Sequence, residues 1–512
     1  MFSNILLIIL PKSLRLRWGL DESERKFIKQ LKPHLKAATR TTGPRLLVQM
    51  PPDYFCLALF SLAISYLRPS VIRGLWHQSI VSSPRQETFS PLRYFGRNFA
   101  RFFDQRKWSR LYKALGINSF FNLEPIFWSK FLNRIEARRI FLKLATKQDL
   151  LDLRLNGLAC GDLIYDTYLR YRVQPTVDVK DPYLRHLIAK ALDAQLAANK
   201  IFQRGRFEIF LTNYTSYIQH GIPARVALEC GVHVYSAGNL SQFFKRLSLE
   251  DSLHTTEHWS YKERFAKLED QGLARSQAKN MLKTRFAGGV DKATLYMKSS
   301  AFTNSKASMP SGIEGVVFLH DFFDSPHCHR SMLFPDFLDW IRYTLGVIEE
   351  YRLPIAVKPH PNQLAESREV VAKLQEEFPS ICWLPSNLSN RVIFDSGIRC
   401  GISVYGTILH ELAFHGIAAL AAGDHPHSAF DIAITPNTIE KYRQCLIHFR
   451  ELRLSDNVQE EVLSFYYMHN IHKNEVIDIN FDQWDLRGIG PNDSKRLGIF
   501  LNTHPDYPSL ES

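Results

Sequence analysis

The chain has 512 residues, which is more than one compact domain usually holds and predicts two large domains. Hydrophobic residues make up 45% of it and charged residues 22%, a globular composition that excludes a wholly disordered chain. The formal net charge of +13 favours a polyanionic partner, such as nucleic acid, anionic lipid or an acidic polymer, without choosing among them.

The seven cysteines are scattered and form no CxxC pair, a pattern typical of a reduced cytoplasmic protein without a zinc site. The apolar runs at 1–10 and 54–67 are both shorter than the roughly 20 residues that a transmembrane helix needs. At 93–110 basic residues alternate with aromatic ones, which fits either a helix with a solvated basic face or a membrane-binding surface. We expect a cytoplasmic protein, at most peripheral on the inner face of the cell membrane.

The first half opens as a parallel α/β sheet. Strand-like runs at 45–50 and 71–76 flank an apolar helical segment at 54–67. Further elements are expected as basic helices over 90–150, a helix at 184–202, strands at 207–212 and 232–235, and polar helices within 238–310.

The second half alternates strands and helices more regularly, which predicts a doubly wound parallel sheet. Its strands are expected at 315–320, 354–358, 381–384, 399–403 and 418–422, and its helices at 337–351, 366–378 and 408–415. Polar residues punctuated by Gly and Pro after about residue 480 predict a loosely held tail.

These patterns predict an α/β fold with two doubly wound, Rossmann-like domains that face a cleft. We divide the chain into an N-terminal basic and apolar segment at 1–40, a first domain with helical insertions at 41–310, a second domain at 311–450, and C-terminal helices and a tail at 451–512.

A Lys-Pro-His-Pro-Asn motif follows the strand at 354–358, at the sheet edge where open α/β sheets bind ligands. Prolines on both sides of His360 restrict its backbone. Lys358 and His360 can both donate to a phosphate, although a solvent-exposed histidine in a turn is the simpler interpretation.

A second motif, GISVYGTILHE, runs from a strand through a turn into a helix at 401–411. The N–H groups near Gly406 and Thr407, with the Ser403 hydroxyl, can hold a phosphate, and Glu411 can bind two ribose hydroxyls. The alternative is that Thr407 is an ordinary N-cap and Glu411 a charge that compensates the helix dipole.

The order and spacing of these motifs resemble the GT-B glycosyltransferases of the bacterial capsular polysaccharide synthesis family, which include Kdo transferases, and also bacterial sialyltransferases with an HP motif. The resemblance covers mainly 315–445, with weaker similarity at 156–170 and 207–235. It implies that His360, Ser403 and Thr407 hold the donor phosphate and that Glu411 contacts the donor ribose. The motif at 401–411 lacks a Ser-Ser pair, which argues against a sialyltransferase that uses CMP-sialic acid.

Polar loops follow other strands of the second domain. The segment HDFFDSPH places His320, Asp321 and Asp324 after a strand, and Asp424 follows another. We interpret both as loops that face the cleft, because the ligand spacing fits no strong metal template and we expect no metal.

In the first half, Asp162 and Asp166 lie one turn apart at a predicted helix start. An inverting transferase needs a carboxylate to deprotonate the acceptor hydroxyl, and Asp162 is the first candidate and Asp166 the second. A helix-start role for Asp162 is the alternative. His220 follows a strand and is a further cleft candidate.

We therefore expect an inverting, metal-independent glycosyltransferase without a cofactor. It would move Kdo or another acidic sugar from a nucleotide-sugar, with a CMP-linked donor favoured by the resemblance, to a growing capsular or surface polysaccharide. The alternatives are a nucleotide-sugar 2-epimerase and a teichoic-acid-type polyol-phosphate transferase. The expected partners are the donor and a glycan or lipid-linked acceptor; an anionic membrane surface is a further candidate, and nucleic acid is not expected.

Overall fold

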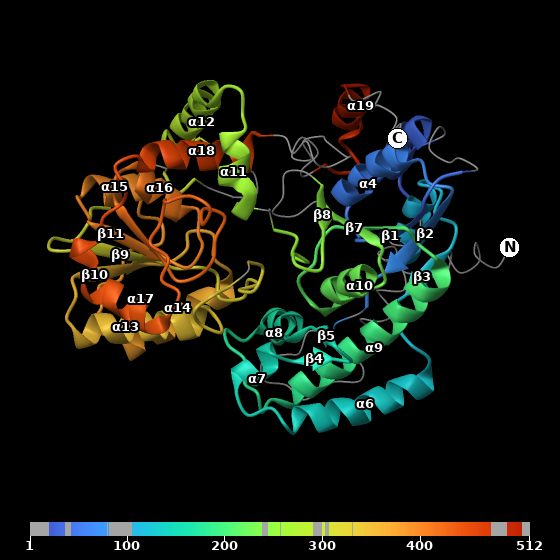
Figure 1. Cartoon of the computed structure of the whole chain (residues 1–512), viewed down its shortest axis with the longest axis horizontal. Helices are drawn as coiled ribbons and strands as arrows, with labels where there is room; N and C mark the ends of the chain where they lie inside the picture. The colour runs from blue at the N-terminus through green and yellow to red at the C-terminus, as the bar shows by residue number, and fades with distance from the viewer. Residues whose placement is uncertain are drawn as a thin grey trace.

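The computed structural model describes residues 20–35, 42–78, 80, 105–237, 244–255, 258–289, 300–302, 307–329, 331–472 and 489–503. Two α/β units lie side by side, each built around its own sheet (Figure 1). The first unit holds the described residues of 20–255 and 489–503, and the second holds those of 258–472. This confirms the predicted fold class of two Rossmann-like units facing a cleft, the GT-B arrangement. The apolar run at 1–10 and residues 93–104 of the basic, aromatic segment lie outside the described residues.

The first sheet has six strands in the order β3-β2-β1-β6-β7-β8, parallel except for β8. Its strands are β1 (Arg45–Gln49), β2 (Val71–Trp76), β3 (Phe120–Asn122), β6 (Ile209–Thr212), β7 (His233–Ser236) and β8 (Lys245–Leu247). Leu46 and Val48 enter one apolar core and Leu47 the other, because alternate side chains of a strand point to opposite faces. Helices therefore cover both faces of this sheet, which explains its uninterrupted apolar strands.

The helix α4 (Tyr54–Leu67) has the predicted bounds and is apolar all round because it lies inside the core. Asp53 caps its start by accepting from the Phe55 N–H. The other elements of this unit are α3 (Glu22–Leu35), α6 (Phe127–Phe141), α7 (Lys147–Leu151), the hairpin of β4 (Arg154–Leu155) and β5 (Leu158–Ala159), α8 (Gly161–Tyr168), α9 (Pro182–Gly205), α10 (Ile218–Glu229) and α19 (Ser494–Thr503).

The second sheet has four parallel strands in the order β10-β9-β11-β12. They are β9 (Gly315–Phe318), β10 (Ile355–Lys358), β11 (Cys400–Ser403) and β12 (Ala418–Ala421). The predicted strand at 381–384 is a single bridge between Trp383 and Val357. The helices of this unit are α11 (Tyr261–Ala266), α12 (Gln271–Phe286), α13 (Phe337–Glu350), α14 (Ala365–Glu377), α15 (Asn390–Asp395), α16 (Ile408–Phe414), α17 (Ile439–Ile447) and α18 (Val458–Asn470).

Helices near the domain boundary and near the C-terminus pack on units other than those of the predicted domain division. The helices α11 and α12 precede residue 311, yet they lie with α18 over the second sheet (Figure 1). Apolar side chains of α12 such as Ala278 and Leu282 share a core with Phe465 of α18. The helix α19 instead packs on α3 with Leu497 fully buried, so this part of the predicted tail belongs to the first unit.

A polar contact joins the two units beside the cleft. The buried Asp336 carboxylate, at the start of α13, accepts at 2.5 Å from the hydroxyls of both Tyr165 and Thr176 of the first unit. Lys147 pairs with Asp339 at 2.6 Å. These bonds fix α8 against the second unit and thereby position the candidate site. None of the described helices is both long enough and apolar enough to cross a membrane.

Candidate functional site

The site begins at the carboxyl edge of the second sheet. The chain runs from β9 to β10 on one side and then crosses to β11 on the other, so the switch point lies between β9 and β11. Open parallel sheets bind ligands outside such a point. Here His320 follows β9 and Ser403 ends β11, and the His320 Nε2 atom lies 3.1 Å from the Ser403 hydroxyl. Burial lowers the pKa of His320 to about 3, so its ring is neutral.

His360, in the loop after β10, belongs to the same edge. Burial is the main cause that lowers the His320 pKa, and a positive charge on His360 would lower it further. The Asn362 N–H donates to its Nδ1 atom at 3.2 Å. In the neutral ring the proton is then on Nε2, which can donate to an anionic oxygen. Burial also lowers the pKa of His360, which the Asp321 carboxylate opposes.

The turn before α16 completes this edge. A Cβ atom at Gly406 would lie 3.4 Å from the Ser403 hydroxyl and 3.5 Å from the His320 ring. The Gly-Thr turn therefore lies against Ser403 and His320 at this edge. Its predicted meeting with the Lys-Pro-His-Pro loop at a donor phosphate stays a prediction.

Two predicted donor-binding residues lie deeper than expected. Lys358 is only 3% exposed and donates to Asn390 at 2.5 Å, and burial lowers its pKa to about 8. Glu411 is 1% exposed and accepts from the Arg285 Nε at 2.9 Å. Arg285 also reaches the Thr407 hydroxyl at 3.4 Å. Arg285 was not predicted, because it lies 126 residues before Glu411 and no periodic pattern links them. A direct contact of Glu411 with ribose stays a prediction.

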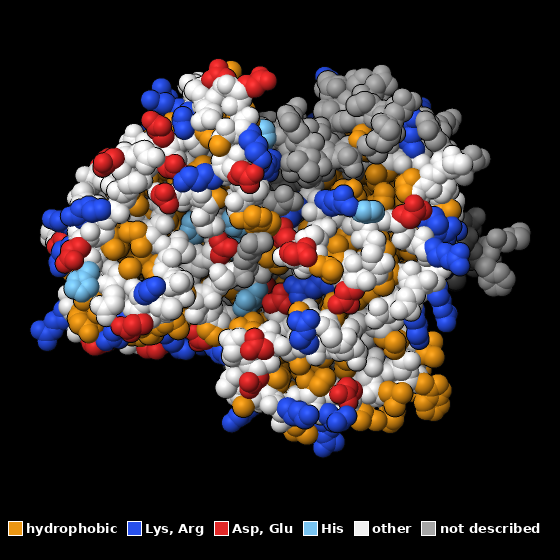
Figure 2. Space-filling view, in the orientation of Figure 1, with side chains coloured by type: hydrophobic (Ala, Val, Ile, Leu, Met, Phe, Trp, Pro, Cys, Tyr) orange, Lys and Arg blue, Asp and Glu red, His pale blue; other side chains and the backbone are white. Residues whose placement is uncertain are grey.

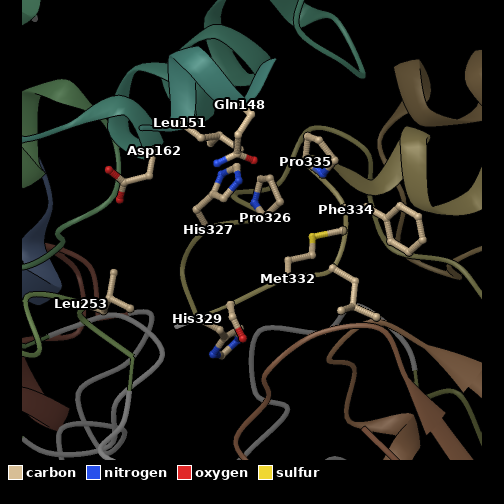
Figure 3. Close-up of a pocket in the computed structure, with 12 residues that line it drawn as sticks. Gln148, Leu151, Asp162, Leu253, Pro326, His327, His329, Met332, Phe334 and Pro335 are labelled. Atoms are coloured by element: carbon tan, nitrogen blue, oxygen red, sulfur yellow. The ribbon is translucent and has the colours of Figure 1, made fainter. Parts of the chain in front are cut away.

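A pocket of about 360 Å³ opens between the two units (Figure 3). The first unit contributes α7, the start of α8 and Leu253, and the second contributes the long loop after β9. The lining residues are Gln148, Leu151, Asp162, Leu253, Pro326, His327, His329, Ser331, Met332, Leu333, Phe334 and Pro335. The same loop rests on Tyr405, whose hydroxyl donates to the Ser325 carbonyl at 3.1 Å, so the pocket adjoins the polar edge of the second sheet.

The histidine of this pocket is tied to a carboxylate of the other unit. The His327 Nδ1 atom lies 2.6 Å from the Asp166 Oδ1 atom, and the side chains are 15% and 3% exposed. Burial alone would lower the His327 pKa, but the Asp166 carboxylate outweighs it and raises that pKa. Burial raises the pKa of Asp166, which His327 opposes. A carboxylate on Nδ1 leaves Nε2 of His327 as the atom that exchanges protons with the pocket.

Asp162, the first candidate for the base, is engaged elsewhere. Its two carboxylate oxygens accept from the two terminal nitrogens of Arg225, at 2.8 and 2.5 Å. Burial raises its pKa, but Arg225 outweighs burial and the net effect is a lowered pKa, which makes the carboxylate a weaker base. The Asp162 carboxylate also points away from His327 in Figure 3. Asp162 lies in the first turn of α8, and its carboxylate is held by Arg225.

The first sheet presents its own polar edge at the switch point between β1 and β6. The Gln49 side-chain oxygen accepts from Thr212 at 2.6 Å and lies 3.1 Å from the His220 Nδ1 atom. The His77 ring stacks on His220 at 5.5 Å. Burial lowers the pKa of His220 well below its ordinary value, so this ring is a neutral hydrogen-bonding group.

Tyr217 and Asp324 belong to the polar edges of the two units: Tyr217 precedes α10, and Asp324 lies in the loop after β9. Tyr217 has a φ of +66°, which a bulky side chain rarely adopts, and such strain is frequent at ligand sites. Burial and then the Asp324 charge raise its pKa. The Asp324 side chain is exposed, yet burial of its surroundings and then the Asp321 charge raise its pKa, and its role as a cleft residue stays a prediction.

The other two predicted cleft carboxylates have structural partners. Asp321 accepts from the Leu364 N–H at 2.7 Å and from the Ser367 hydroxyl at 3.0 Å, and thereby holds the start of α14. Asp424 lies 3.5 Å from the His258 Nε2 atom. Within the described ranges, no group of three or more His, Cys, Asp or Glu side chains is placed to hold a metal ion.

No known protein family and no curated protein matches the sequence. Similar solved structures include Thermosulfurimonas dismutans KpsC, a beta Kdo 2,4 transferase, with 13% identity, a TM-score of 0.31, and coverage of 51% of this chain and 79% of that chain. S. aureus MnaA in a structure with UDP has 9% identity, a TM-score of 0.25, and coverage of 91% and 99%. A UDP-N-acetylglucosamine 2-epimerase has 9% identity, a TM-score of 0.24, and coverage of 92% and 99%. Similarities this distant carry no conclusion about activity.

Proposed function

We propose that this protein is an inverting glycosyltransferase that moves a sugar from a nucleotide-sugar donor to a glycan acceptor, with His327 as the general base. One observation carries the proposal: the His327–Asp166 pair spans the two units at a pocket that adjoins the polar edge of the second sheet. A donor at that edge and an acceptor against the first unit would meet at this pocket.

In the proposed reaction the acceptor hydroxyl oxygen attacks the anomeric carbon. The bond from that carbon to the donor phosphate breaks, and the hydroxyl proton passes to the Nε2 atom of His327. The Asp166 carboxylate stabilises the resulting imidazolium. His360, Ser403 and the backbone near Gly406 would hold the departing phosphate. The family resemblance favours a CMP-linked acidic sugar as donor and a capsular or surface polysaccharide as acceptor.

Nucleotide binding tests the donor half of the site. In a thermal-shift panel of CMP, CDP, UDP and GDP, the nucleotide of the donor should stabilise the protein by ~2.7 kcal/mol when present at about 100 times its dissociation constant. His360→Ala should remove most of that shift, because His360 would donate to the phosphate. His448→Ala is the matched control, since His448 lies on the surface of the same unit. Equal thermal shifts in the two variants would show that His360 does not bind the donor phosphate.

The pH dependence of the rate tests the base. A general base must be unprotonated, so the rate should rise with pH as His327 loses its proton. Because the Asp166 carboxylate raises the His327 pKa, Asp166→Asn should move this rise to lower pH and reduce the maximal rate. Rates of nucleotide release between about pH 5 and 9 give the profile. A rise at the same pH in this variant would mean that another group is the base.

Product analysis separates the proposal from the alternatives. Incubation with UDP-GlcNAc alone should leave the sugar unchanged, whereas its conversion to the 2-epimer would identify an isomerase. A reaction that requires a CDP-polyol would identify a polyol-phosphate transferase.

A further inference from the structure

The outer face of α6 carries large apolar side chains in contact with solvent. Five of them, Phe127, Trp128, Phe131, Leu132 and Ile135, are between 49% and 72% exposed. Ile126 and Leu142, at the two ends of the helix, are exposed by 67% and 71%. Soluble proteins rarely leave so many neighbouring aromatic and aliphatic side chains uncovered, and patches of this kind mark interaction sites.

The helix presents these side chains as one stripe. At about 100° per residue, the five positions within α6 fall on an arc of roughly 140°. Ala137, which is fully buried, lies on the opposite side, where α6 packs on α9. Burial within the first unit therefore does not explain the apolar stripe, because the unit uses the other face of the helix.

Basic side chains border the stripe. Arg134 and Arg138 lie along one edge of it and Arg139 and Lys143 along the other, and all four are exposed. The segment 126–143 holds five basic residues and one acidic residue, Glu136, which accepts from Arg139 at 3.0 Å. Figure 2 shows hydrophobic side chains gathered at the right-hand end of α6 and basic side chains along its lower edge.

We propose that this face of α6 docks on an anionic lipid bilayer, in the plane of the headgroups. Trp, Phe and Leu on one face with Lys and Arg at its borders is the composition of interfacial helices. The apolar side chains would enter the acyl boundary while the long basic side chains remain among the anionic headgroups. The net charge of +13 acts in the same direction. The proposal goes beyond the proposed function and does not depend on it.

Charge argues for lipid rather than a second copy of the chain. A symmetric pair of α6 helices would bring the basic borders of two copies together, with a single acidic residue from each copy to offset them. An anionic bilayer neutralises the same residues.

Vesicle flotation with the full chain tests the proposal. The protein should float with vesicles of phosphatidylcholine and phosphatidylglycerol, and much less with phosphatidylcholine alone. The combined variant Phe127→Ser, Trp128→Ser, Phe131→Ser should weaken binding by at least about 100-fold. Arg134→Gln, Arg138→Gln, Lys143→Gln should weaken it about 100-fold for anionic vesicles only. Leu249→Ser with Leu273→Ser is the control, because these leucines are 65% and 56% exposed away from α6.

Each outcome of this experiment either supports or overturns the lipid-docking proposal. Loss of flotation in both α6 variants, with unchanged thermal unfolding and full binding by the control, supports a lipid-docking helix. Wild-type protein that remains unbound to anionic vesicles overturns the proposal. Conversion of a dimer to a monomer by the apolar variant, with flotation unaffected, also overturns it and assigns the face to a second copy. Nucleotide shifts measured without vesicles should be the same in all variants, which keeps this test separate from that of the proposed function.

Discussion

His327→Ala should lower kcat by about 10²- to 10⁴-fold, the usual contribution of a positioned general base. The variant removes the imidazole that Asp166 holds at 2.6 Å at the pocket between the units. The nucleotide-induced thermal shift should persist, because the donor-phosphate groups belong to the loops after β10 and β11. Nucleotide release in the presence of acceptor is the measurement.

Two further measurements separate a base from a structural residue. Added imidazole should restore part of the rate to His327→Ala, since the side chain leaves a space of its own shape, and this rescue should increase with pH as free imidazole loses its proton. His448→Ala should keep the full rate. A rate in His327→Ala within a few fold of the wild type would reject the assignment, and loss of the nucleotide shift would mean that the variant had disturbed the fold.

The local pattern of the chain predicted much of the fold because strands and helices follow side-chain periodicity. The bounds of α4 and β2 agree with the prediction, and β10, β11 and β12 fall within a residue or so of theirs. The switch-point rule then brought His320, His360 and Ser403 to one edge from sequence alone. What failed locally was the strand at 381–384, whose backbone pairs at Trp383 only.

The contacts that join distant segments were not predictable in the same way. Asp166 and His327 are 161 residues apart, and their pairing depends on how the two units pack. The sequence therefore indicated an acidic helix face and named its carboxylates as base candidates, but it did not reveal that Asp166 pairs with His327. The place of α12 was missed for the same reason: its buried side, with Ala274, Ala278 and Leu282, fits any apolar surface, and only the tertiary structure selects α18.

Arg285→Ala should destabilise the second unit by about 3–5 kcal/mol, the usual cost of removing one partner from a buried ion pair. The Arg285 and Glu411 side chains are 6% and 2% exposed, so Glu411 would keep a buried charge without its main partner. Urea unfolding is the measurement. Lys279→Ala is the matched control on the exposed side of α12 and should change stability by less than about 0.5 kcal/mol.

A double variant that removes both charges separates an effect on stability from an effect on nucleotide binding. In Arg285→Met, Glu411→Met the unpaired charge is gone, and stability should return to near the wild-type value, because buried ion pairs are often no more stabilising than apolar side chains of similar volume. The nucleotide shift should still be reduced, since Arg285 also holds the Thr407 hydroxyl of the turn before α16. A double variant that is both stable and fully responsive to nucleotide would mean that the pair only supports the fold. One that is stable but unresponsive would tie the Arg285–Glu411 pair to the donor site, through the Thr407 turn that Arg285 contacts or through the predicted contact of Glu411 with the donor ribose.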